Sequence, residues 1–233
     1  MKKFVLFIMA FALLLGGCAA AGKNDLVQPS SPLPVETAEP AVIEALSEEE
    51  LTSFEALFAV MLQMDGRMQI NPRNCFLTSY YDSAAELDMQ AFLRYFPGSE
   101  SGSEAEFEAL RALPGWPFAD LAGINDMPVP LSRYDGESVR QALRTYAGLG
   151  LEDVDISAES RVYYLEDYDA FYNYTSDFGL EQPDFYRGER QGDTVRLYWQ
   201  HWYDGERELS LREAESGWLV LSHRLISPKV EEN

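Results

Sequence analysis

The spacing of apolar residues changes along the chain. Residues 4–15 form an unbroken apolar run, whereas residues 19–40 show no helical or strand period. Between residues 46 and 148, apolar side chains mostly recur every three or four positions, as in helices with one buried face. After Pro183 the segments are β-rich and are separated by turn residues. The pattern therefore predicts helices first and strands afterwards.

The predicted helices begin at capping signals. Three serines are each followed, three positions later, by a glutamate, the capping-box spacing: Ser47 with Glu50, Ser83 with Glu86, and Ser103 with Glu106. A fourth helix is predicted between Asp135, as its N-cap, and Gly148, as its left-handed exit. The first helix is expected to stop at Gly66, after burying one face that consists of Leu51, Phe54, Leu57, Phe58, Met61 and Leu62.

The second half of the chain predicts strands. "RVYYL" is a short strand candidate, and "EDYDAFYNY", which follows it, is interpreted as a helical turn. The runs after Pro183 are separated by three turn segments: Gln191-Gly192, Asp204-Gly205-Glu206 and Glu215-Ser216-Gly217. We expect an antiparallel meander with the N-terminal helices packed on it, which is an α+β fold. An NTF2-like cone is one form of this arrangement, by analogy only.

A register for the meander follows from its turns. We expect Tyr203 to pair with Arg207, and Glu213 to pair with Trp218. In this register six apolar residues lie on one face of the sheet, which should be the core face: Leu197, Trp199, Leu209, Leu211, Trp218 and Val220.

The same register separates the two histidines. His201 falls at the edge of the core face, and His223 falls on the opposite face beside Trp202 and Glu208, with which it could form an ion pair. Side chains on opposite faces of a sheet cannot bind one metal ion, so no two-histidine zinc site is predicted. A one-residue slip of either hairpin would change this assignment.

The start of the chain has the features of a bacterial export signal. Lys2 and Lys3 precede the apolar run, which is shorter than the about 20 residues that span a bilayer. Leu15-Gly16-Gly17-Cys18 follows and resembles the lipobox of bacterial lipoproteins. The resemblance implies cleavage before Cys18 and a diacylglycerol on its thiol, which would anchor the protein to the outer face of the cell membrane. A plain signal peptide with a chance cysteine is the alternative.

Four parts are predicted along the chain. Residues 1–17 are a lipoprotein signal peptide, and residues 18–40 are the lipidated cysteine and a disordered, Pro-rich linker. Residues 41–228 form a single α+β domain, and residues 229–233 form a tail. The 22 residues after Cys18 could reach roughly 70 Å when stretched, which would hold the domain away from the membrane.

Charge excludes some partners. The chain has 39 acidic and 18 basic side chains and a net charge of −21, and removal of the leader would take Lys2 and Lys3 away as well. There is no basic stripe for nucleic acid and no polybasic patch for anionic lipid. An acidic surface favours solubility and attracts cations or basic partners.

Common catalytic and metal-binding motifs are missing from the sequence. There is no Gly-rich phosphate loop, no G-x-S-x-G and no H-E-x-x-H, and the acidic stretch at Asp153 lacks the EF-hand glycine and glutamate. Cys75 has no disulfide partner once Cys18 is acylated, and we interpret it as a small buried residue. No catalytic residue, metal or cofactor is predicted, although two carboxylates placed for glycoside hydrolysis stay open.

Aromatic residues are dense between residues 163 and 178. One interpretation is that these rings seal the junction between helices and sheet. The other is that some of them, together with Tyr198 and Trp202 of the meander, line a groove for a sugar or a peptide. The ligand-binding candidates on this second interpretation are Tyr168, Tyr172, Tyr198 and Trp202.

Four segments, taken in order, resemble a group of uncharacterised lipoproteins from Gram-positive (Firmicutes-type) gut bacteria. They are "RNCFLTSYYDSAAELDMQAFL", "VRQALRTYAGLGLEDV", "YYLEDYDAFYNYTSDFG" and "GDTVRLYWQHWYDGERELSLRE". Members of the group often have His-aromatic-His where this chain has Asn173 and Thr175, so no histidine site is carried over. The resemblance implies a surface location and one α+β domain, without an activity.

These observations favour a non-catalytic surface lipoprotein that binds a small ligand, a glycan, a peptide or a protein partner. A hydrolase that acts on cell-wall or dietary glycan through two carboxylates is the first alternative. An accessory subunit of an envelope complex is the second.

Overall fold

The computed structural model describes residues 42–64, 66–157, 160–174 and 179–228. The described residues belong to one compact unit. The predicted signal peptide, Cys18, the linker and the C-terminal tail lie outside the described residues and stay predictions. Within the described ranges, no helix combines the length and the apolarity needed to cross a bilayer.

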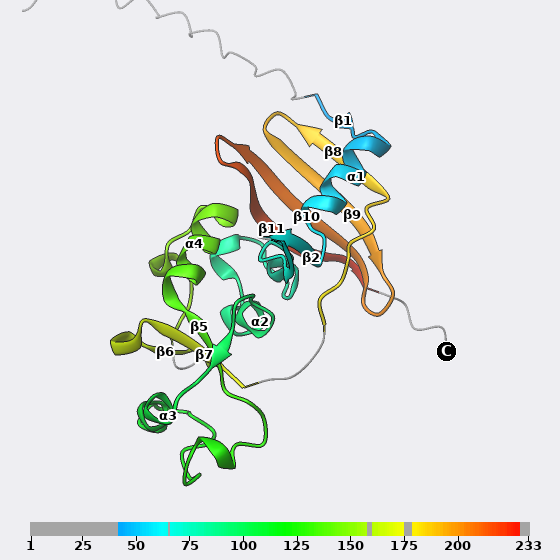
Figure 1. The fold of residues 1–233 in the computed structure, drawn as a ribbon. Coiled ribbons are helices and arrows are strands. Elements are labelled where there is room, and N and C mark those ends of the chain that lie inside the picture. Colours follow the sequence, from blue (N-terminus) through cyan, green and yellow to red (C-terminus); the bar gives the residue numbers. More distant parts are fainter. Residues whose placement is uncertain (1–41, 65, 158–159, 175–178, 229–233) are drawn as a thin grey trace, which may run out of the picture. The chain divides into compact units, whose positions relative to one another are not determined.

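The α+β class and the C-terminal meander are confirmed (Figure 1). Five antiparallel strands form the main sheet in the order β1-β8-β9-β10-β11. Their bounds are Glu44–Ala45 (β1), Arg187–Gln191 (β8), Thr194–His201 (β9), Gly205–Ala214 (β10) and Gly217–Pro228 (β11). Two of the three turns of the meander lie at the predicted glycine-containing segments, and the turn between β9 and β10 lies two residues before its predicted place.

The helices begin at the predicted caps. Ser47 and Ser103 each form a complete capping box, and Asp135 caps the fourth helix, which leaves through Gly148 at φ 69°. Ser83 instead caps a short 3₁₀ turn, Ala84–Glu86. The α-helices are Glu48–Leu57 (α1), Met89–Arg94 (α2), Glu104–Arg111 (α3) and Gly136–Ala147 (α4).

The prediction that the first helix runs to Gly66 is wrong. Helix α1 ends at Leu57, and β2 (Met61–Met64) pairs with β3 (Arg67–Ile70) in a two-stranded hairpin. The Asn71 amide donates to the carbonyl oxygens of Leu57 and Ala59, which gives these backbone acceptors at the C-terminal end of the helix a partner. Gly66 has φ 75° in the hairpin turn, so the Asp-Gly pair is a hairpin signal here rather than a helix stop.

A second, four-stranded sheet was not predicted. It has the order β4-β5-β7-β6 and consists of Glu100–Ser101 (β4), Ser132–Asp135 (β5), Tyr163–Leu165 (β6) and Ala170–Asn173 (β7). The predicted helical turn after β6 is present only as a 3₁₀ turn, Glu166–Tyr168. All four residues of β7 are buried, so the strand lacks the alternation of buried and exposed positions that would reveal it.

Two apolar clusters hold these layers together. The larger one joins α1, α2 and α4 to the inner face of the meander, and α1 lies across that sheet (Figure 1). Cys75 belongs to it, fully buried and free, and burial raises the pKa of its thiol to about 12. This burial confirms the interpretation of Cys75 as a small buried residue. The smaller cluster joins α3 to the second sheet through Phe107, Leu110 and Tyr172.

One of the two predicted strand registers is wrong. Glu213 pairs with Trp218 as expected, but Arg207 lies opposite Trp199 rather than Tyr203. The turn sits two residues earlier than predicted, because Gly205, at φ 125°, pairs with His201 and becomes the first residue of β10. The resulting shift of four positions is even, so the predicted core face is kept.

A β-bulge in β11 also overturns the placement of His223. Ser210 pairs with Ser222 and Leu211 pairs with Val220, so Leu221 is an extra residue. The bulge turns His223 onto the core face opposite Leu209, where it is completely buried. The prediction that His201 and His223 lie on opposite faces, with His223 paired to Glu208, is therefore wrong.

Candidate functional site

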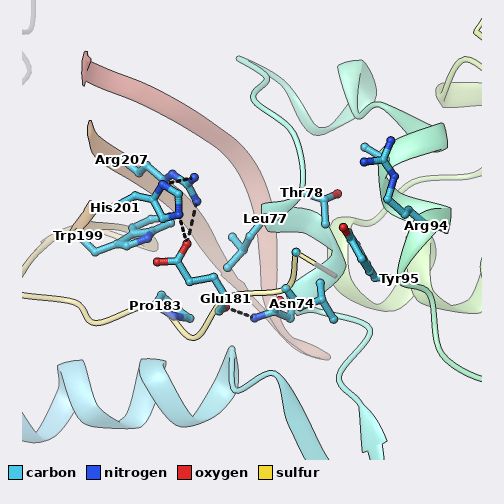
Figure 2. Close-up of a pocket in the computed structure, with 13 residues that line it drawn as sticks. Asn74, Leu77, Thr78, Arg94, Tyr95, Glu181, Pro183, Trp199, His201 and Arg207 are labelled. Atoms are coloured by element: carbon cyan, nitrogen blue, oxygen red, sulfur yellow. Dashed lines mark hydrogen bonds and ion pairs between the residues drawn. The ribbon is translucent and has the colours of Figure 1, made fainter. Parts of the chain in front are cut away.

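A pocket of about 170 Å³ lies beside the β9–β10 end of the meander (Figure 2). Its walls come from β9, β10, the turn that contains Asn74, helix α2 with the residue after it, and the irregular segment 179–183. Four of its lining side chains are ionisable acids or bases of the kind that bind polar ligands: Arg94, Glu181, His201 and Arg207. Figure 2 shows Arg94 and Tyr95 on the far side from His201 and Arg207.

The turn between β9 and β10 fixes the basic wall of the pocket. Asp204 lies in this turn, with His201 before it and Arg207 after it. Arg207 donates from Nε and Nη2 to the two carboxylate oxygens of Asp204, at 3.1 and 2.7 Å. Its side chain is only 10% exposed, and its guanidinium lies 5.4 Å from the centre of the Tyr80 ring. Arg207 is therefore held rigidly against the sheet.

Asp204 is the negative charge that neutralises Arg207 in this wall. Burial raises the pKa of Asp204, but hydrogen bonds from Arg207 and from the Tyr80 hydroxyl outweigh it and hold the pKa well below its usual range. Burial and the bond to Asp204 both raise the pKa of Tyr80. Asp204 is thus ionised, and Tyr80 is a neutral donor to it.

The His201 ring is held between two carboxylates. Its Nδ1 lies 2.6 Å from Asp204 and its Nε2 lies 2.5 Å from Glu181. Nδ1 is also 2.8 Å from Nη2 of Arg207, so it either donates to Asp204 in the imidazolium or accepts from Arg207 in the neutral ring. In both forms the contact with an ionised Glu181 places a proton on Nε2.

Glu181 reaches this wall from an irregular segment. Its backbone oxygen accepts from the Asn74 amide at 2.8 Å, and the same amide nitrogen donates to Phe58. The next residue, Gln182, donates to the carbonyl oxygen of Glu55 at 2.9 Å. The backbone of the segment is therefore tied to the end of α1, whereas the Glu181 side chain is 33% exposed.

This geometry suits the binding of a polar ligand better than the binding of a metal ion or glycoside hydrolysis by two carboxylates. In the part of the chain that the structure describes, no three His, Cys, Asp or Glu side chains converge to hold a metal ion. Glu181 and Asp204 contact opposite nitrogens of His201, so the ring fills the space that a glycosidic bond would need between two catalytic carboxylates.

The aromatic candidates lie apart from this pocket, and none of the four lines it. Tyr172, in β7, is buried, and its hydroxyl donates to Glu106 at 2.7 Å. Tyr168 is partly exposed in the 3₁₀ turn beside that strand. Tyr198 is buried under the Arg187 guanidinium, 3.7 Å from its ring centre, and Trp202 is 75% exposed at the β9–β10 turn.

Sequence reasoning weighed His201 but missed its partners. The spacing His201, Asp204, Arg207 around a turn glycine brings an acid and a base to one hairpin end, and this signal was available. Glu181, which precedes His201 by 20 positions, had no local signal of its own. Comparison of the chain with protein-family models, with curated proteins and with solved structures gives no match. The resemblance to a lipoprotein group stays a prediction.

Proposed function

We propose that the protein is a lipid-anchored, extracytoplasmic binding protein that takes a small polar ligand into the pocket beside the β9–β10 turn. The observation that carries the proposal is the lining of that pocket: two arginines, a histidine and a glutamate surround a cavity of about 170 Å³. Few convergent charged groups in a small cavity are typical of binding sites for small polar molecules.

The anchor and the location rest on the sequence. The basic n-region, the short apolar run, Leu15-Gly16-Gly17-Cys18 and the Pro-rich stretch after it support a surface lipoprotein. In the producing cell, the wild-type protein should partition with membranes and carry an acyl mass on Cys18. Cys18→Ser should lose both. A wild-type chain recovered with a free thiol at Cys18, or retained in the cytosol, would contradict the anchor.

Two alternative functions and the NTF2-like form of the fold are proposals with less support. A glycan hydrolase would need two carboxyl groups that face each other across a substrate, and Glu181 and Asp204 have the His201 ring between them. No observation favours an accessory subunit. The NTF2-like form is supported by the pocket between helical segments and the meander, but the second sheet is not part of such a cone.

Ligand binding is tested by calorimetry and thermal shift on the purified chain with a panel of small acids, amines, sugars and wall fragments. Arg94→Gln should weaken the binding of any hit at least tenfold, which is about 1.4 kcal/mol. The matched control is Arg212→Gln, which removes the same charge from an exposed position outside the pocket. A panel without a hit, or equal effects of both substitutions, would count against the proposed site.

A further inference from the structure

We propose that the pocket selects a small carboxylate, and that the Glu181 side chain fills the carboxylate seat until the ligand displaces it. This inference rests on the proposed binding function and adds the chemical class of the ligand. The seat consists of two N–H donors: Nε2 of His201, at 2.5 Å from Glu181, and Nη1 of Arg207, at 3.6 Å from the same oxygen.

The seat is built independently of Glu181. Asp204 holds Arg207 through Nε and Nη2, which leaves Nη1 directed toward the pocket wall. The same carboxylate lies against Nδ1 of His201, which leaves Nε2 on the pocket side. The two donor side chains are 10% and 11% exposed, and fixed donors of this kind recognise a carboxylate without reorganising.

The occupant is less constrained than the seat. Glu181 belongs to a segment without regular secondary structure, and its side chain is 33% exposed. The Asn74 amide holds its backbone oxygen, so rotation of the side chain away from the seat breaks none of the backbone contacts of the segment. A ligand carboxylate can therefore replace the Glu181 carboxylate at the seat, so that one negative charge takes the place of another.

Charge favours the exchange. When Glu181 leaves the seat, Arg207 keeps its pair with Asp204, but Nε2–H of His201 loses its acceptor and Nη1 of Arg207 loses an ion-pair contact. Arg94 adds a second guanidinium to the lining. The cavity is also below the roughly 300–1,000 Å³ of sites for drug-sized ligands, which limits the ligand to a small acid.

The test compares Glu181→Gln with wild type in direct binding to acetate, D-lactate, D-alanine and D-glucuronate. Glutamine keeps the size of the side chain and removes the competing charge. We expect Kd for the acids that bind to fall about tenfold, the factor for a seat that is free one-tenth of the time in wild type. Acetamide and glucose, which lack a carboxylate, should show no gain. The four acids distinguish simple, hydroxy, amino and sugar acids as the source of the carboxylate.

Glu215→Gln is the matched control, because it changes the net charge equally at an exposed turn outside the pocket. Glu181→Ala, checked for folding by its thermal transition, should tighten acid binding as Glu181→Gln does. Unchanged Kd in both Glu181 variants, or an equal gain in Glu215→Gln, would overturn the displacement. Tighter binding of neutral ligands alone would overturn the carboxylate class and leave the proposed binding function intact. Absence of any ligand in every variant would overturn that function itself.

Discussion

His223 lies flat against Trp199, with ring centroids 5.4 Å apart and ring planes inclined by 5°. The imidazole is completely buried, and its Nδ1 lies 2.7 Å from the carbonyl oxygen of Ser79. A carbonyl oxygen only accepts, so Nδ1 carries the proton. Burial lowers the pKa of His223 to about 3, which keeps the ring neutral in the folded protein.

Stability should therefore fall as the pH drops below 6.5. Between pH 6.5 and about 3 the unfolded chain binds a proton at His223 that the folded chain does not. The free energy of unfolding then decreases with falling pH, by at most about 1.4 kcal/mol per pH unit from this group. Denaturant titrations between pH 7 and 5 measure it, above the range in which the carboxylates titrate.

His223→Gln should flatten this part of the pH profile, whatever its effect on stability at pH 7. Val220→Ala is the control, since it truncates a buried neighbour in the same strand without a titratable group. An unchanged slope in His223→Gln would show that another group causes the acid sensitivity.

Glu106 and Glu50 occupy the same position in two capping boxes but differ in burial. The Glu106 side chain is 7% exposed and accepts from Arg133 at 2.8 Å and from Tyr172 at 2.7 Å, in addition to Ser103. Burial raises the pKa of Glu106, but the hydrogen bonds from Ser103 and Tyr172 outweigh it and lower the pKa to about 2. The Glu50 side chain, in contrast, is 43% exposed.

Glu106→Gln should cost about 3 kcal/mol in the free energy of unfolding, because it leaves Arg133 without its buried counter-charge. Glu50→Gln should cost much less, because water replaces the lost contacts at an exposed helix start. Equilibrium denaturation of both variants at pH 7 gives the comparison. Equal losses would show that the cap alone, without Arg133 and Tyr172, sets the contribution of Glu106.

Deletion of Leu221 should remove the bulge of β11. Without this extra residue, Ser222 follows Val220 directly, so Leu209 still pairs with His223 and the imidazole stays against Trp199. We therefore expect the deletion to cost only about 1 kcal/mol in the free energy of unfolding, because the strand loses its local bend but keeps its core face. Leu221→Ala, which keeps the bulge, is the control, and equilibrium denaturation compares the two variants. A loss of several kcal/mol in the deletion variant alone would show that the bend itself is needed to pack His223.

Cys75 should be inert in the folded protein. Its thiol is fully buried with a pKa of about 12, so it forms about a thousandfold less thiolate than at the ordinary value of 9.0. In a Cys18→Ser chain, Cys75 is the single remaining thiol. Alkylation should then proceed only as fast as the protein unfolds. Native labelling at the rate of a free thiol would contradict the burial.

Local signals in the sequence were sufficient for part of the fold. Ser47, Ser103 and Asp135 cap helices because each satisfies nearby backbone groups, and glycine-containing turns separate the strands of the meander. Strand β7 was missed because both its faces are buried. The bulge was missed because Leu221 differs in no way from an ordinary strand residue, and only the packing of His223 selects it.

Part of the candidate site could also be predicted from local sequence signals, and part could not. His201, Asp204 and Arg207 belong to one hairpin, so their proximity follows from a turn that the sequence already indicates. Glu181 joins them through the tether of Asn74 and Gln182 to the end of α1, a contact between segments more than 100 positions apart. Pairings at that distance depend on the completed fold, and neither composition nor periodicity encodes them locally.

The four strands of the meander, β8 to β11, have a cover on each outer strand. On β8, β1 and the Leu46 N–H take backbone groups between Gly188 and Arg190, and on β11, Tyr81 exchanges both backbone hydrogen bonds with His223. A bare strand edge acts as a template to which other chains can add. Fibril-like growth through these stretches would first require β1 or the Tyr81 segment to peel away, which gives the protein a built-in resistance to self-association through its sheet.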